Sequence, residues 1–237
     1  MNRRLLLWLS VLAALALVVA YQTLTSSRAR QADEFATRAD VPTVQPGTDV
    51  LAGIAVLPQR IHRYDYRRDA FGAAWDDDND AVGGHNGCDT RDDILDRDLV
   101  DKTYVATKRC PNAVATGTLH DPYTNAIVAF QRGAHVGQSV QIDHIVPLSY
   151  AWDMGAYSWS DPLRVRFAND PANLLAVQGQ ANQDKGDSAP AEWMPPNASF
   201  ACQYAMQFIA VLRGYSLPID EASTGVLRRA ATTCPTR

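Results

Sequence analysis

The sequence predicts an α+β domain in which a small strand–strand–helix core is wrapped by helices and short strands and stapled by disulfides. Two short apolar runs, at 139–148 and 174–177, are followed by a polar helical stretch at 180–187. Further along, residues 199–212 and 220–231 show the apolar spacing of amphipathic helices. Four cysteines complete the pattern, since an even number is typical of paired disulfides in exported chains.

The N-terminus has the pattern of an export signal. The pair Arg3-Arg4 precedes an almost uninterrupted apolar run from Leu5 to Ala20. A run of this length fits a cleaved signal peptide, and counting on to Leu24 it also reaches the length of a membrane anchor. We therefore expect residues 1–24 to be a signal peptide or signal anchor. The remainder would lie outside the cytoplasm, secreted or tethered to the membrane through residues 5–24.

A linker and one globular domain are expected after this segment. Residues 25–50 contain Ser, Thr and Pro with little apolar periodicity, which predicts a flexible linker. The length of 237 residues allows one good-sized domain with an N-terminal tail, or two small domains at most, and we expect residues 51–237 to fold as one domain. A composition of 46% hydrophobic and 20% charged residues argues against wholesale disorder. A helix is expected from Thr90 and short strands within 103–130, with the core at about 139–190.

The four cysteines are Cys88, Cys110, Cys202 and Cys234. They can pair in three ways, and the sequence does not choose among them. We favour the local pairing, Cys88 with Cys110 and Cys202 with Cys234, since each disulfide would close a loop of moderate length. A zinc site is the rival interpretation, but no two cysteines have the CxxC spacing.

Polar residues stand at the junctions of the predicted strand–strand–helix core. Asp143 and His144 lie inside a β-branched run, and neighbouring residues of a regular strand point to opposite faces. For both to serve one site the strand must end or bend there. Asn173 precedes the second strand, while Asn182 and Lys185 are three residues apart and so share one face of the following helix.

These residues resemble the HNH endonuclease (ββα-metal) superfamily. The resemblance rests on Asp143-His144-Ile145-Val146-Pro147-Leu148, then Asn173-Leu174, then Asn182 followed by Lys185. More narrowly, residues 87–91 and 187–195 are similar to exported actinobacterial proteins of the HNH family. Those are related to the C-terminal (DUF1524-like) domain of the GmrSD restriction endonucleases.

The resemblance implies metal-dependent hydrolysis of DNA phosphodiester bonds. Catalytic roles fall to three residues: His144 as general base, Asn173 as the side chain that holds the strand junction, and Lys185 as the contact to the scissile phosphate. Asp143 and Asn182 would ligate one divalent ion, Mg²⁺ or Mn²⁺. The sequence departs from the His-Asn-His pattern of the family name at the last position, where Asn182 replaces the final His.

The charge balance leaves a second interpretation open. Residues 1–32 hold four of the 22 basic residues and none of the 26 acidic ones, so the rest carries a net charge of −8. Nucleic-acid binding normally rests on a basic surface. The alternatives are therefore an exported, non-catalytic binding domain on an HNH scaffold, or a nuclease acting on RNA. No protein partner is implied.

The segment 60–81 interleaves arginines with aromatic residues. Such a segment could contact a nucleic-acid backbone and its bases. More often it forms the edge of a core and keeps its charges in water. The sequence alone leaves both interpretations open.

Overall fold

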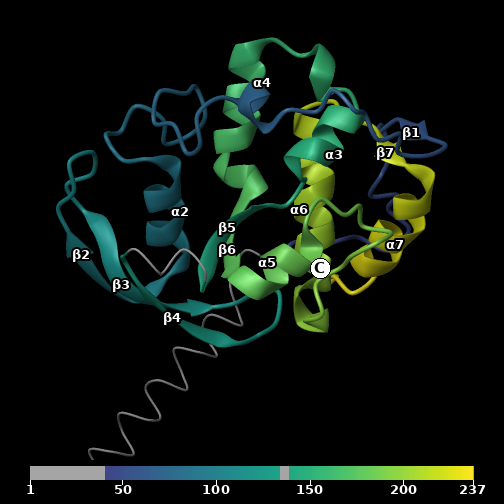
Figure 1. Cartoon of the computed structure of the whole chain (residues 1–237). Helices are drawn as coiled ribbons and strands as arrows, with labels where there is room; N and C mark the ends of the chain where they lie inside the picture. The colour runs from purple at the N-terminus through teal and green to yellow at the C-terminus, as the bar shows by residue number, and fades with distance from the viewer. Residues whose placement is uncertain (1–40, 134–138, 237) are drawn as a thin grey trace, which may run out of the picture. The chain divides into compact units, whose positions relative to one another are not determined.

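The structure, a computed structural model, describes residues 41–133 and 139–236. Residues from Pro42 onward form one compact unit (Figure 1). The expected export signal at residues 1–24 lies outside the described residues. Within the described part of the chain, no helix is long and apolar enough to cross a membrane.

Short antiparallel strands build two of the sheets. One sheet has the order β2-β3-β4, with β2 at Val100–Val105, β3 at Ala113–His120 and β4 at Ile127–Gln131. A second sheet pairs β5 (Val140–His144) with β6 (Leu174–Gln178). The expectation of short strands within 103–130 is confirmed, with β2 beginning slightly earlier.

The segment β5, β6 and α5 follows the expected strand–strand–helix order. β6 continues directly into α5 (Gly179–Lys185), which packs against both strands. The residues between the two strands form α3 (Leu148–Asp153) and α4 (Asp161–Asn169). Pro147 precedes α3, so the chain turns away from the sheet soon after His144.

The β5–β6 ribbon lies between two hydrophobic clusters. Ile142 and Leu174 join the cluster formed with α2 (Thr90–Asp98) and β3. Ile145 and Val177 join the larger cluster formed with the C-terminal helices. In β6, the neighbours Ala176 and Val177 belong to different clusters, as the two-residue period of a strand requires.

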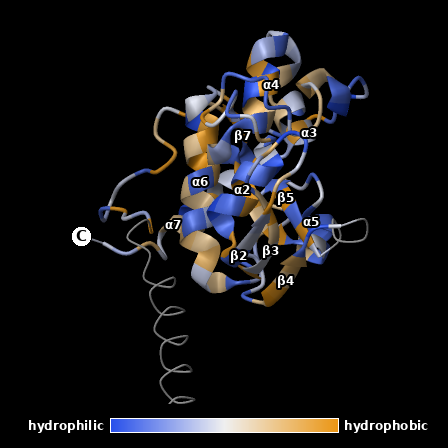
Figure 2. Ribbon diagram, turned by 90° about the vertical axis from the view of Figure 1, so that its left-hand side faces the viewer, coloured by the Kyte–Doolittle hydropathy of each residue, from blue (hydrophilic) through white to orange (hydrophobic). Residues whose placement is uncertain are grey.

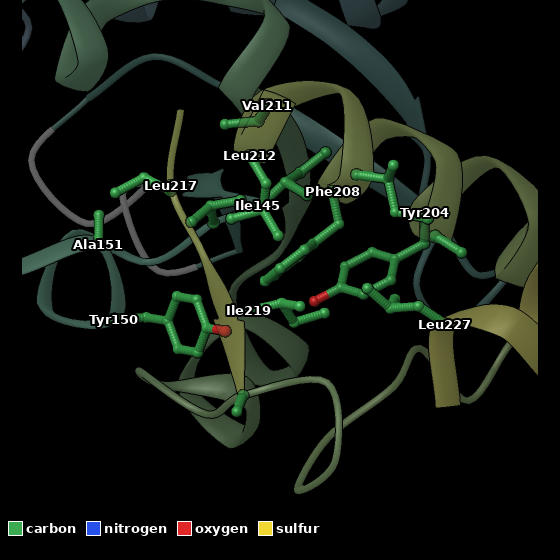
Figure 3. Close-up of a cluster of buried hydrophobic side chains, with 14 of the residues drawn as sticks. Ile145, Tyr150, Ala151, Tyr204, Phe208, Val211, Leu212, Leu217, Ile219 and Leu227 are labelled. Carbon is green, nitrogen blue, oxygen red and sulfur yellow. The ribbon is translucent and has the colours of Figure 1, made fainter. Parts of the chain in front are cut away.

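The larger cluster is centred on α6 (Ala201–Gly214) and α7 (Glu221–Ala231). Its side chains pack around Phe208, and all those labelled in the close-up are buried (Figure 3). The ribbon of α6 carries both hydrophobic and hydrophilic colours, as an amphipathic helix should (Figure 2). Both helices were expected from the sequence. A short parallel pair, β1 (Val56–Leu57) with β7 (Ile219–Asp220), leads into α7.

Four single-turn 3₁₀ helices complete the described elements. They lie at Arg68–Phe71, Ala156–Ser158, Pro171–Asn173 and Ala198–Phe200. The first of them carries residues that line the candidate site described below.

Two disulfides staple the unit, and they have the favoured local pairing. Cys88 bonds Cys110 and thereby ties the loop before α2 to the loop between β2 and β3. Cys202 bonds Cys234 and ties the start of α6 to the chain beyond α7.

Residues 42–50, part of the expected linker, pack against the C-terminal part of the compact unit. The backbone N–H of Val44 donates to the carbonyl of Pro235 at 3.1 Å, and Val50 is only 6% exposed. The ordered unit thus begins closer to the N-terminus than the composition of this segment indicates.

Candidate active site

Asp143 and His144 end β5 at the junction of the two hydrophobic clusters. Both side chains are buried, at 5% and 7% exposed. Because they are neighbours on a strand, Asp143 points toward α5 and His144 toward α4. Both nevertheless line one cleft of about 440 Å³, called here the polar cleft. The strand ends at His144, so two neighbouring residues with opposite directions lie at one end of the cleft wall.

The ring of His144 is fixed by one hydrogen bond and one stacking contact. Its Nε2 lies 2.9 Å from the carbonyl oxygen of Ala168 on α4. Since a carbonyl can only accept, Nε2 carries the hydrogen and the lone pair of the neutral ring is on Nδ1. Burial lowers the pKa of His144 to about 3, so the ring is neutral near pH 7.

Trp75 supplies the stacking contact. Its ring lies 5.5 Å from that of His144, centroid to centroid, with 11° between the planes. Trp75 has a backbone φ of 59°, a left-handed conformation that is costly for a bulky residue. Backbone strain of this kind is concentrated at active sites and ligand-binding sites. Here it places the indole ring against His144.

Asp143 sits in a buried hydrogen-bond network. Its carboxylate accepts from the hydroxyl of Tyr123 at 2.5 Å and from Nζ of Lys185 at 2.9 Å. Nζ also donates to the carbonyl oxygen of His144 at 2.8 Å. Burial raises the pKa of Asp143 and lowers that of Lys185, and the ion pair opposes both shifts.

Lys185 is enclosed by the protein on all sides. A contact to the scissile phosphate needs an ammonium group that reaches solvent, yet Lys185 is 0% exposed. Its three donors are directed inward because the carboxylate of Asp143 would otherwise be buried without a counter-charge. In this structure Lys185 is a partner of Asp143 rather than a phosphate contact.

Asn173 joins the ends of the two strands. Its side-chain oxygen accepts from the backbone N–H of Val146 at 2.8 Å, and its amide nitrogen donates to the carbonyl of Val146 at 3.2 Å. Its own carbonyl accepts from the N–H of Ile145 at 2.8 Å. The chain just after His144 is therefore clamped to the start of β6.

Asn182 and Asp143 are the residues that could hold a cation. Both line the polar cleft, and Asn182 donates its amide nitrogen to Gln141 at 2.8 Å. The described residues contain no group of three or more His, Cys, Asp or Glu side chains that could hold a metal. One carboxylate and one amide oxygen fit Mg²⁺ or Mn²⁺, which keep several waters, and do not fit a zinc site. The donor set is thus compatible with the expected cation.

A cation that the motif did not indicate lines the polar cleft. Arg68 is exposed and belongs to the interleaved segment 60–81. Its neighbours are paired with carboxylates, Arg63 with Asp65 at 2.6 Å and Arg67 with Asp69 at 3.8 Å. Arg68 is one of the residues that line the cleft together with Asp143, His144 and Asn182.

Sequence reasoning missed Arg68 and Trp75 as individual site residues. The signal in the sequence was the alternation of Arg and aromatic residues in 60–81. This alternation points to the segment as a whole and does not say which of its residues reach the site. The same segment holds a structural arginine: Arg60 bonds Asp153 at 2.7 Å and Ser149 at 3.1 Å. The segment thus serves both as core edge and as cleft wall.

Comparison with known proteins places the chain in a family. Residues 89–229, more than half of the chain, match the C-terminal domain of the GmrSD restriction endonucleases. The chain belongs to this family. The resemblance drawn from the sequence is thereby confirmed, and the family is of a nuclease type. The match covers Asp143, His144, Asn173, Asn182 and Lys185, whereas Arg68 and Trp75 precede it.

A fungal protein is similar over most of its length. The chain is 34% identical to an uncharacterized secreted protein of Arthroderma benhamiae over 201 residues, which cover 82% of this chain and 88% of the relative. No solved structure matches the chain.

Proposed function

We propose that the protein is a metal-dependent endonuclease that hydrolyses DNA phosphodiester bonds, with His144 as the general base. One observation carries the proposal: Nε2 of His144 is bound to Ala168, which leaves Nδ1 as the proton acceptor of a ring that lines a cleft together with Asp143 and Asn182. Membership in a nuclease-type family supports the same reaction class.

The proton step falls to Nδ1 of His144. It would accept the proton of the attacking water while Nε2–H stays bonded to Ala168 and Trp75 keeps the ring in place. A pKa near 3 keeps the lone pair free at neutral pH. The negative charge of a bound phosphodiester opposes that shift, because it stabilises the protonated ring that forms.

Asp143 and Asn182 would hold the divalent cation in the polar cleft. When bound, the cation supplies charge neutralisation for the phosphate and the leaving oxygen. Lys185 and Tyr123 keep the carboxylate of Asp143 in one orientation. Asn173 holds the backbone after His144, so the base and the ligands are carried on one rigid ribbon.

Arg68 takes the role that the resemblance assigns to Lys185. Its guanidinium lies at the wall of the polar cleft, where it can bind a phosphate through two parallel hydrogen bonds. A single well-placed arginine also explains how a chain of net charge −4 could bind a polyanion. The binding should weaken as salt rises.

Plasmid cleavage by the exported part of the chain tests the proposal. We expect nicking that requires Mn²⁺ or Mg²⁺ and falls about 10²–10⁴-fold in His144→Ala, since general-base catalysis contributes that much. His85→Ala is the matched control, because His85 is exposed and does not line the polar cleft. Full cleavage by folded His144→Ala would sink the mechanism.

A non-catalytic binding domain is the second candidate, and the acidic net charge favours it. Calorimetry with Mn²⁺ separates the two. A live site should bind the ion and lose that binding in Asn182→Ala, whereas an inert scaffold should show no such difference. Metal-dependent cleavage of RNA, with DNA left intact, would keep the enzyme and change its substrate.

The same proposal places the protein outside the cytoplasm. Two disulfides fit an oxidising compartment, and the fungal relative is named as secreted. Mass spectrometry of the mature N-terminus would decide between secretion and anchoring. Detection of the unprocessed chain only in the cytosol would contradict both.

A further inference from the structure

A second hollow, called here the apolar cavity, opens on the other side of His144. It has a volume of about 320 Å³ and shares three lining residues, Arg68, His144 and Leu148, with the polar cleft. The two hollows are therefore neighbours that meet at the proposed base. None of the roles assigned above uses this second hollow.

The lining of the apolar cavity differs from that of the polar cleft. The polar cleft contains Asp143, Asn182, Ser149 and Asp187. In the apolar cavity only Arg68, Asp69 and His144 carry a charge or a titratable ring. The remaining walls are glycine or apolar residues: Phe71, Gly72, Ala73, Ala74, Trp75, Leu148 and Ala168.

The walls of the apolar cavity are held in place before any ligand arrives. Phe71 is buried with its ring about 6 Å from those of Trp152 and Phe167. Gly72 has a φ of +86° and lies so close to α4 that an added Cβ would come within 2.8 Å of Val165. A preformed apolar site loses little conformational entropy on binding, which favours a rigid planar ligand.

We propose that the apolar cavity binds one unpaired nucleobase of the substrate, next to the phosphodiester held in the polar cleft. The inference rests on the proposed function and specifies its substrate. The volume is at the lower end of small-ligand pockets, which suits a single base rather than a base pair. Arg68 lines both hollows, so it can hold the scissile phosphate while the base of the adjoining nucleoside enters the apolar cavity.

The geometry has a consequence for strandedness. A base inside a duplex is stacked and paired, so it must leave the helix before it can enter a cavity. A single strand offers its bases without that cost, and stacking on aromatic side chains tolerates every base. The enzyme should therefore cleave single-stranded DNA faster than duplex of the same sequence, by about tenfold or more.

Direct binding tests the cavity without depending on cleavage. Calorimetry in EDTA would compare thymidine 5′-monophosphate with 2-deoxyribose 5-phosphate, which has the same phosphate and sugar without the base. We expect the nucleotide to bind about tenfold tighter to the wild type, because one base–aromatic stack contributes that much. Equal affinity for the two ligands would overturn the proposal.

A pair of variants locates the binding. Ala74→Phe fills the apolar cavity from an exposed turn, and Ala52→Phe adds the same group at an exposed position outside both hollows. The nucleotide preference should vanish in Ala74→Phe and persist in Ala52→Phe, with thermal unfolding confirming that both fold. A preference that survives in folded Ala74→Phe counts against this cavity. Should Ala74→Phe not fold, Ala73→Phe fills the same space.

The results separate this inference from the proposed function. Metal-dependent plasmid cleavage without any nucleotide preference would leave the nuclease standing and remove the base pocket. A preference that Ala74→Phe abolishes, in a protein that cleaves nothing, would support the pocket and remove the nuclease.

Discussion

Two cations flank the Asp143–His144 pair, and the protein holds them in opposite ways. Lys185 is fully buried, with its ammonium group bound to Asp143 and to the carbonyl of His144. Arg68 is exposed and lines both hollows that meet at His144. One cation comes from the motif, and the other from a segment far upstream of it.

The difference shows that position in a motif does not decide what a charge touches. A buried carboxylate needs a counter-charge, and Lys185 on the facing side of α5 supplies it. The ammonium group of Lys185 is then bound to groups of the protein itself. Under the proposed function, a different cation must bind the phosphate. The comparison predicts that replacing Lys185 lowers mainly the stability of the fold. Replacing Arg68 should lower mainly the binding and cleavage of the proposed substrate.

The largest effect is expected for Lys185→Met. Removing one partner of a buried ion pair leaves the other charge uncompensated, which typically costs about 3–5 kcal/mol. Urea unfolding followed by circular dichroism would measure the loss. Lys102→Met is the control, because Lys102 pairs with the half-exposed Asp96 near the surface and should cost under about 1 kcal/mol. Similar losses in both variants would erase the distinction drawn here.

A smaller effect, on activity alone, is expected for Arg68→Ala. Losing a charge-assisted contact to phosphate should reduce cleavage about 10- to 100-fold with little change in melting temperature. Arg67→Ala removes the same charge from the adjacent residue, which lines neither hollow, and should cleave normally. If Arg67→Ala loses as much activity as Arg68→Ala, net charge rather than placement is responsible.

The smallest effect concerns the loop that precedes Arg68. Arg63, and then Trp152, hold the pKa of Asp65 at about 2, below the usual 3.8. The contact therefore stabilises the fold above pH 3.8, and this stabilisation is lost as the pH falls through about 2. The small difference in melting temperature between wild type and Asp65→Asn should shrink over that range. A difference that stays constant from pH 5 to pH 2 would exclude the contact as its source.

The elements of the fold were largely predictable because their patterns are local. The runs around Asp143 and after Asn173 became paired strands, and the stretch holding Asn182 became a helix. The local disulfide pairing also held. Residues 42–50 could not be placed, since a segment without apolar periodicity shows no local sign that it packs on distant residues.

The candidate site was predictable only where its residues share one ribbon. Asp143, His144 and Asn173 lie on or next to β5 and β6, so their proximity follows from strand pairing. Helical spacing predicts which residues share a face of α5, but it does not predict what packs on that face. The burial of Lys185 therefore could not be predicted from the sequence, because it depends on tertiary packing. Trp75 reaches His144 through a strained turn that no spacing rule describes.

The disulfide between Cys88 and Cys110 has a further consequence for how firmly the loop around Trp75 is held. It closes a loop with a sequence separation of 22, which restricts the unfolded chain by about 3 kcal/mol. The stretch it fixes begins shortly after Trp75, whose carbonyl also accepts from the N–H of Thr90. A newly made, reduced chain would hold this wall of the site less firmly. Formation of this disulfide therefore helps to hold the loop that places Trp75 against His144.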